Sequence, residues 1–221
     1  MEKYYKEVYS EKPGPGGDDS WPVFVPTSAI LVSCVDQTGR ANIIPLTGWG
    51  VLCRFPFQIG IAICKDKYTK NYFRRYSYEM IQETGEFVVN IPDVRLRDAI
   101  TVCGEHSARD PEVDKFKLAG LTPGASKIVK APFIEECPVN LECIVRHTLP
   151  LGSHDVFIGE VVASHMYGEI EKAEVLEEMN EWTLAPVDAD TLRPRGEKMK
   201  LVWKGLIDFE AADESPRTGL Q

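Results

Sequence analysis

The sequence predicts a mainly β protein of the α+β class, with helices inserted between its strands. Strand-like segments dominate the chain, and helical segments interrupt them at irregular intervals. A regular βαβ alternation is missing, so we do not expect a doubly wound parallel sheet. Gly14-Pro15-Gly16-Gly17 neither follows a predicted strand nor opens a helix, so it is not a dinucleotide-binding loop.

The first two predicted strands cover Thr27–Val35 and Ala41–Leu46, on either side of a turn that contains Gly39. Pro45 has no N–H to donate to a ladder, which indicates an edge strand or a bulge. Further strands follow from the same patterns, at Phe57–Cys64, Glu86–Ile91, Val139–Val145, Val156–His165 and Lys200–Phe209.

The strand at Phe57–Cys64 has two different faces. Isoleucine occupies every second position, at Ile59, Ile61 and Ile63, which indicates a buried face. The opposite face carries only Gly60, Ala62 and Cys64, which we call the small-residue face. Either a large flat group or a packed helix could approach the backbone there, and the sequence leaves both interpretations open.

Helices are predicted in three places. The best candidate is Thr69–Thr84, with Thr69 as N-cap, Gly85 as the stop, and apolar residues at helical spacing. A shorter helix is expected at Arg95–Cys103, and an acid-rich, solvated helix at Lys172–Glu181.

Composition limits the partners and the location. Acidic residues outnumber basic ones by 34 to 25, and the formal net charge is −9. Nucleic-acid binders and proteins of anionic membrane surfaces rely on positive fields, so we expect neither partner. No apolar run approaches the roughly 18 residues of a membrane span. The six cysteines include no Cys-x-x-Cys pair, so we expect free thiols, a cytoplasmic protein and no metal site.

We expect one domain overall. Residues 1–20 are rich in glycine and proline toward their end and form a flexible arm. Residues 21–168 form the β domain, and residues 169–221 add a C-terminal helix and strand packed on it.

A basic cluster follows the small-residue face in an otherwise acidic chain. It consists of Lys65, Lys67, Lys70, Arg74 and Arg75. Because the first turn of a helix offers unpaired N–H groups, a phosphate could bind there with the Thr69 hydroxyl and a lysine. The alternative, favoured by charge and spacing alone, is a solvated basic face on a helix that Thr69 merely caps.

The segment Asn42–Thr47 is a second candidate, because a bulge at Pro45 would expose backbone groups to a ligand. The alternative interpretation, which is favoured when this segment is considered alone, is the end of an ordinary strand.

Several segments in this order resemble the flavin reductase-like family, the flavoredoxin group of FMN-binding split barrels. The similarity runs from about Pro26 to Met166. The matching segments are Thr38–Pro45, Lys67–Thr69, Thr84–Pro92, Asp114–Phe116, Glu136–Cys143 and Gly152–Val161. The resemblance implies a six-stranded Greek-key split β-barrel with inserted helices, and a homodimer with FMN at the subunit interface.

The resemblance also implies an activity. It implies an FMN-binding oxidoreductase that passes electrons from a reduced nicotinamide or an iron–sulfur protein to a flavin or another acceptor. The alternative is an FMN-binding storage or sensor protein without turnover. A β-barrel protein that binds no flavin and serves in assembly is a further alternative.

Site residues are carried over from the resemblance by position. The cofactor-binding residues expected are Asn42, Pro45, Leu46, Thr47, Lys65, Lys67, Tyr68, Thr69, Asn71, Lys115 and Phe116. His154 is the one catalytic candidate, in the place of the family's Gly-Asp-His segment. Here Ser153 replaces the usual acid and Asp155 follows the histidine. A structural, partly exposed histidine is the alternative interpretation.

Overall fold

A computed structural model describes residues 27–65, 74–166, 182–184 and 199–201. The chain divides into two compact units, Met1–His165 and Met166–Gln221. In the second unit, β10 (Trp182–Leu184) pairs antiparallel with β11 (Met199–Leu201). The helix predicted at 172–181 and most of the strand predicted at 200–209 lie outside the described residues. The N-terminal arm and the packed C-terminal extension stay predictions.

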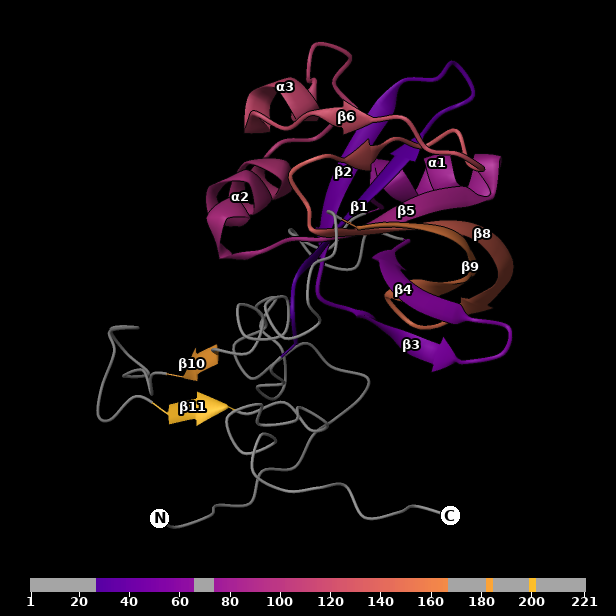
Figure 1. The fold of residues 1–221 in the computed structure, drawn as a ribbon. Coiled ribbons are helices and arrows are strands. Elements are labelled where there is room, and N and C mark those ends of the chain that lie inside the picture. The colour runs from indigo at the N-terminus through magenta and orange to yellow at the C-terminus, as the bar shows by residue number, and fades with distance from the viewer. Residues whose placement is uncertain (1–26, 66–73, 167–181, 185–198, 202–221) are drawn as a thin grey trace. The chain divides into compact units, whose positions relative to one another are not determined.

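A mainly antiparallel sheet of seven strands organises the first unit (Figure 1). Its order is β2-β1-β5-β8-β9-β4-β3. The strands are β1 (Ile30–Val35), β2 (Ala41–Leu46), β3 (Trp49–Cys53), β4 (Gln58–Cys64), β5 (Glu86–Ile91), β8 (Val139–Pro150) and β9 (His154–Met166). A small second sheet pairs β6 (Pro123–Gly124) with β7 (Phe133–Ile134).

The sheet curls, because its two edge strands are consecutive in the chain. Only Thr47 and Gly48 separate β2 from β3, although these strands lie at opposite ends of the sheet order. At this corner the Gly48 carbonyl accepts a hydrogen bond of 2.7 Å from the Ala62 N–H of β4. The sheet is not closed, and it forms the expected split barrel.

The observed sheet has one strand more than the six that were predicted, and β3 is the strand that the sequence patterns missed. Gly48 and Gly50 interrupt its apolar pattern, and glycine weakens the strand signal. The other strands of the sheet match their predictions closely, and β2 and β5 match residue for residue.

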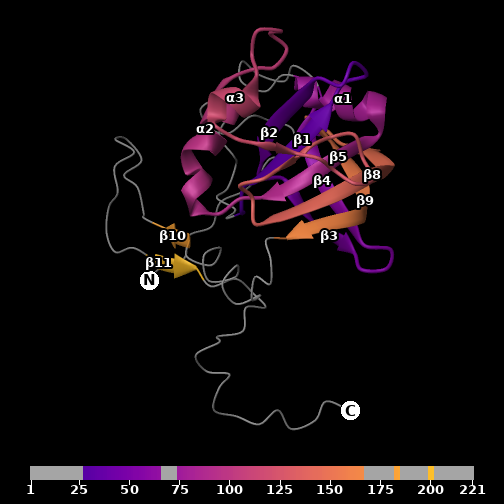
Figure 2. The ribbon, with the colours of Figure 1, turned by 45° about the horizontal axis from the view of Figure 1, so that its top comes forward.

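Among the described residues, three α-helices accompany the sheet. They are α1 (Tyr76–Thr84), α2 (Arg97–Glu105), which follows the 3₁₀ turn η1 (Val94–Leu96), and α3 (Lys115–Ala119). Figures 1 and 2 show α2 and α3 on one side of β1 and β2, and α1 on the other. Each side buries its own apolar cluster.

The prediction that α1 begins at Thr69 is wrong. The N-cap of α1 is Arg75, which has extended backbone (φ −77°, ψ 142°) and no side-chain cap. The predicted end is confirmed: Gly85 takes a left-handed conformation (φ 71°) and donates its N–H to Ile81. Apolar spacing located the buried face of α1 but did not determine where the helix starts.

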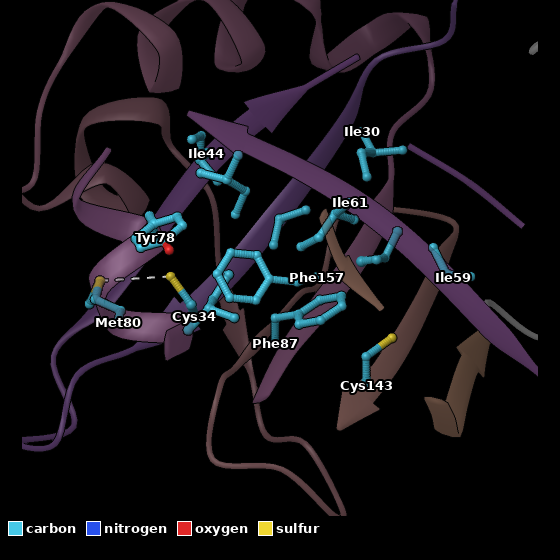
Figure 3. Close-up of a cluster of buried hydrophobic side chains, with 14 residues drawn as sticks. Ile30, Cys34, Ile44, Ile59, Ile61, Tyr78, Met80, Phe87, Cys143 and Phe157 are labelled. Atoms are coloured by element: carbon cyan, nitrogen blue, oxygen red, sulfur yellow. Dashed lines mark hydrogen bonds between the residues drawn. The ribbon is translucent and has the colours of Figure 1, made fainter. Parts of the chain in front are cut away.

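The larger core lies between α1 and the strands. Figure 3 shows Tyr78 beside Phe157, and their rings meet edge to face with centroids 5.2 Å apart. Isoleucines from β4 fill the same space, as their spacing predicted. The second core lies under α2 and α3, where Phe116 and Cys103 pack against Ile43 and Leu31. β1 and β2 are therefore covered on both faces.

Candidate functional site

The small-residue face of β4 is turned away from the larger core. Ile59, Ile61 and Ile63 are fully buried in that core, so Gly60, Ala62 and Cys64 point to the other side of the sheet. β9 continues this face, because residues directly opposite in register share a side of the sheet. Cys64 pairs with His154, and Ala62 pairs with Val156.

His154 therefore belongs to the small-residue face. The Ser153 hydroxyl lies 2.8 Å from Nδ1 of its ring. Partial burial lowers the pKa of His154, and the positive charge of Arg75 lowers it further. The imidazole is therefore mainly neutral at pH 7.

Part of the small-residue face is occupied by another side chain of the protein. A Cβ added at Gly60 would lie 2.7 Å from a terminal methyl of Leu52 on β3. Leu52 is itself 56% exposed, so this cover lies at the surface. At Ala62 the face borders the β2–β3 corner, because a Cβ at Gly48 would lie 3.1 Å from that of Ala62.

The predicted residues of the β2–β3 corner therefore lie next to this face. Pro45 and Leu46 are half-buried, and Thr47 is exposed. Thr47 directly precedes Gly48, whose carbonyl accepts from Ala62. Residues predicted from two distant segments, Thr47 and His154, thus both adjoin β4.

Lys65 follows β4 directly and forms an ion pair. Its Nζ lies 2.8 Å from Oδ1 of Asp155. Its backbone N–H donates to the Ser153 carbonyl at 3.2 Å, beside His154. The pair lowers the pKa of Asp155 below its usual value, together with the Tyr78 hydroxyl, although burial of the carboxyl opposes them. Asp155 is therefore a carboxylate at pH 7.

Arg75 adds a second positive charge at this end of β4. Its backbone N–H donates to the Cys64 carbonyl at 3.1 Å. Its charge lowers the pKa of His154 and that of Lys115, in each case in addition to burial, so Arg75 lies within electrostatic reach of both. The described part of the predicted basic cluster thus gathers where β4 ends, α1 begins and β9 begins.

Asn42, Lys115 and Phe116 are buried around β2. The Asn42 side chain donates to Ser77 Oγ at 2.8 Å, on the α1 side of the sheet. Lys115 lies on the other side, and its Nζ donates to the carbonyls of Ile43 (2.7 Å) and Cys103 (2.8 Å). Their predicted contact with a cofactor stays a prediction.

Four predicted site residues, Lys67, Tyr68, Thr69 and Asn71, lie outside the described residues. Sequence reasoning missed Asp155 as the partner of Lys65, and Tyr78 as the second partner of Asp155. One signal was present: Asp155 alternates with Phe157 on β9, which places its carboxylate on the buried side of the strand.

Within the described ranges, no group of three or more His, Cys, Asp or Glu side chains could hold a metal ion. Over the same ranges, every helix is too short or too polar to cross a membrane.

The sequence matches the flavin reductase like domain over residues 24–181, so the chain belongs to that family. An uncharacterized protein of Archaeoglobus fulgidus is 36% identical over 135 residues, which cover 60% of this chain and 68% of the relative.

Solved structures share the fold. A flavoredoxin from Methanosarcina acetivorans superposes with a TM-score of 0.65 at 20% identity, covering 96% of this chain and 98% of its own. An FMN-binding protein from Thermus thermophilus gives 0.61 at 21% identity, with 76% and 85% covered. An NADH:FAD oxidoreductase from Streptomyces globisporus gives 0.55 at 19% identity, with 65% and 77% covered. The chain is thus a flavin reductase-like split barrel.

Proposed function

We propose that this protein is an FMN-binding oxidoreductase that takes electrons from a reduced nicotinamide or an iron–sulfur protein and passes them to a flavin or another acceptor. The observation that carries the proposal is the meeting of basic residues with a small-residue strand face in a flavin reductase-like domain. The names of the FMN-binding and NADH-dependent structural neighbours support the cofactor and one of the donors.

The described residues fit such a cofactor. A planar ring needs a strand face without bulky side chains; the half-buried Ala62 offers this, next to the register pair of His154 with Cys64, which is itself 3% exposed. A phosphate needs positive charge and hydrogen-bond donors, and Lys65 and Arg75 bring two cations to the end of the same strand. Leu52 would have to move from Gly60 for a ring to cover the whole face, and its exposure permits that.

Bound FMN would supply the hydride and single-electron chemistry, while the protein binds and orients the reactants. We assign phosphate binding to Lys65, Lys67 and Thr69, with Tyr68 and Asn71 beside them. We assign contacts with the ring to the β2–β3 corner, where backbone groups of Pro45, Leu46 and Thr47 would hydrogen-bond the ring edge.

Three further residues complete the proposed site. Asn42, which is buried on the α1 side of the sheet, would hold the shape of β2 through its bond to Ser77, and Lys115 and Phe116 would support β2 next to the ring. His154 would align the nicotinamide over the small-residue face. Its neutral imidazole suits alignment, since hydride transfer depends mainly on the geometry of the two reactants.

We also propose a homodimer, because the two edges of the sheet differ. On the β2 edge both main-chain groups of Ile43 are taken: its N–H donates to Asn42 Oδ1, and its carbonyl accepts from Lys115. The β3 edge instead exposes Val51 (61%) and Leu52 (56%), an apolar surface that a second copy of the chain would cover.

A cytoplasmic location belongs to the same proposal. All six cysteines are free, and five of them are buried as small apolar side chains. A reducing compartment keeps such thiols unpaired.

The absorption spectrum of the purified protein tests the function. We expect a yellow protein, or one that turns yellow with added FMN, whose absorbance bleaches anaerobically with NADH, NADPH or a reduced ferredoxin. Flavin binding that none of these reductants bleaches would favour a storage or sensor protein. A protein that binds no flavin would overturn the proposal and favour an assembly role.

A further inference from the structure

Asp155 joins separate segments of the fold through its buried carboxylate. The side chain accepts from Lys65 Nζ on one oxygen (2.8 Å) and from the Tyr78 hydroxyl on the other (2.8 Å). The Leu151 N–H also donates to Oδ1, at 3.3 Å. Asp155 is only 6% exposed, so these bonds replace the water that would otherwise solvate its charge.

Tyr78 extends this network to a second basic residue. The Arg74 guanidinium carbon lies 4.9 Å from the centroid of the Tyr78 ring, within the range of a cation–π contact. The Tyr78 ring is itself held edge-on against Phe157 in the larger core. Lys65 and Arg74, which precede and follow residues 66–73, thus both contact the Asp155–Tyr78 pair, and Arg74 also forms an ion pair with Glu79 at 3.4 Å.

The position of Asp155 on β9 explains why its carboxylate meets Lys65. Neighbouring side chains of a strand point to opposite faces, so Asp155 points into the barrel while His154 points to the small-residue face. The order Ser153-His154-Asp155 therefore places the carboxylate where the Lys65 ammonium can meet it.

An ordered lysine binds an anion better than a free one. An unrestrained lysine loses side-chain entropy when it is fixed on a ligand. The ion pair with Asp155 fixes Lys65 beforehand. An ammonium carries three N–H donors, so one bond to a carboxylate leaves capacity for a phosphate oxygen.

We propose that Asp155 is a positioning residue for phosphate recognition: it holds Lys65 directly, and Arg74 through Tyr78, at the end of β4. This inference rests on the proposed function and assigns to Asp155 the preference for FMN over riboflavin, which is the same flavin without its phosphate. The ligand is bound through the two basic residues, and Asp155 itself does not touch it.

The test compares the dissociation constants of FMN and riboflavin, measured by flavin fluorescence quenching on the full chain. In Asp155→Asn we expect the preference for FMN over riboflavin to fall about tenfold, the scale of one charged hydrogen bond. Tyr78→Phe removes only the hydroxyl, and we expect a fall of about threefold. A merely structural role would weaken the binding of both flavins equally and leave the ratio of the two dissociation constants unchanged.

Glu160→Gln is the matched control. Glu160 also lies on β9 and pairs with an arginine, Arg146, at 2.7 Å, but far along the strand from Lys65. It changes the net charge by the same amount, and we expect an unchanged ratio.

An unchanged or increased ratio in Asp155→Asn would overturn the inference, since an increase would mean that Asp155 withholds Lys65 from the ligand. If that variant does not fold, an unchanged ratio in Tyr78→Phe overturns it instead. A wild-type protein that binds neither flavin overturns the proposed function, and the inference falls with it.

Discussion

Lys115 is a cation buried without a described carboxylate partner. It is 6% exposed, and its ammonium donates to two main-chain carbonyls, those of Ile43 and Cys103. Burial lowers its pKa to about 8, which the nearby thiols of Cys103 and Cys34 partly oppose. The ammonium holds the edge of β2 against α2 and α3, and this anchoring is maintained at the cost of burying a charge.

The free-energy cost of burying the Lys115 ammonium should appear in the pH dependence of the protein's stability. Unfolded Lys115 has its ordinary pKa near 10.5, so between pH 8 and 10.5 the unfolded chain binds more protons than the folded one. We therefore expect the wild-type free energy of unfolding, relative to Lys115→Met, to rise with pH across this window by up to about 3 kcal/mol.

Urea unfolding at several pH values measures this difference. Subtracting the Lys115→Met curve removes the contribution of thiols that titrate in both proteins. A pH-independent difference would mean that the folded lysine keeps its ordinary pKa.

At the scale of elements, two glycines in paired strands have different roles. Gly159 on β9 lies against the core: a Cβ there would come within 2.6 Å of the Phe87 ring and 2.9 Å of Cys143. Gly60 on β4 lies on the opposite face, where the nearest atom belongs to the exposed Leu52. Gly159 makes room for packing in the core, and Gly60 leaves its face of β4 without a side chain.

The two alanine variants should therefore differ. We expect Gly159→Ala to destabilise the protein by about 1–3 kcal/mol, because Phe87 is fully buried and cannot move aside. Gly60→Ala should cost less than about 1 kcal/mol, since Leu52 can move, yet weaken FMN binding roughly tenfold.

Urea denaturation and FMN titration of both variants provide the check. Equal destabilisation by the two substitutions would contradict the assignment of faces. Unchanged FMN affinity in Gly60→Ala would remove this part of β4 from the flavin site.

For the whole molecule, the open sheet leaves two unequal edges. Pro45 and the bonds of Ile43 block the β2 edge against a further strand. The β3 edge, with its following turn, exposes Val51, Leu52 and Phe55. A lone subunit would present these apolar side chains to water.

We expect a dimeric mass for the wild-type protein by light scattering, and a shift toward monomer in Leu52→Glu, because the added charge would be desolvated in the interface. Leu118→Glu is the matched control: Leu118 is 50% exposed on α3, and its substitution should leave the mass unchanged. A monomeric wild-type protein that binds FMN tightly would contradict the dimer.

Much of the fold could be read from local patterns. The isoleucines of β4 and the pattern of β5 predicted buried strands, and Gly85 predicted the end of α1, since each signal involves neighbours in the chain. The start of α1 and the strand β3 could not be predicted in this way. Arg75 takes extended backbone while its N–H bonds to Cys64, and β3 is held by its pairing with β4.

The features of the candidate site likewise divide into those that the sequence predicts and those that only the tertiary structure shows. The sequence by itself determined the strand types, the two faces of β4, the excess of basic residues after it and the family to which the chain belongs. Only the tertiary structure decided that Lys65 is bound by Asp155, that His154 shares the small-residue face and that Lys115 is buried under β2. These contacts join residues far apart in the chain, and their partners are set by strand order and register, which no local pattern encodes.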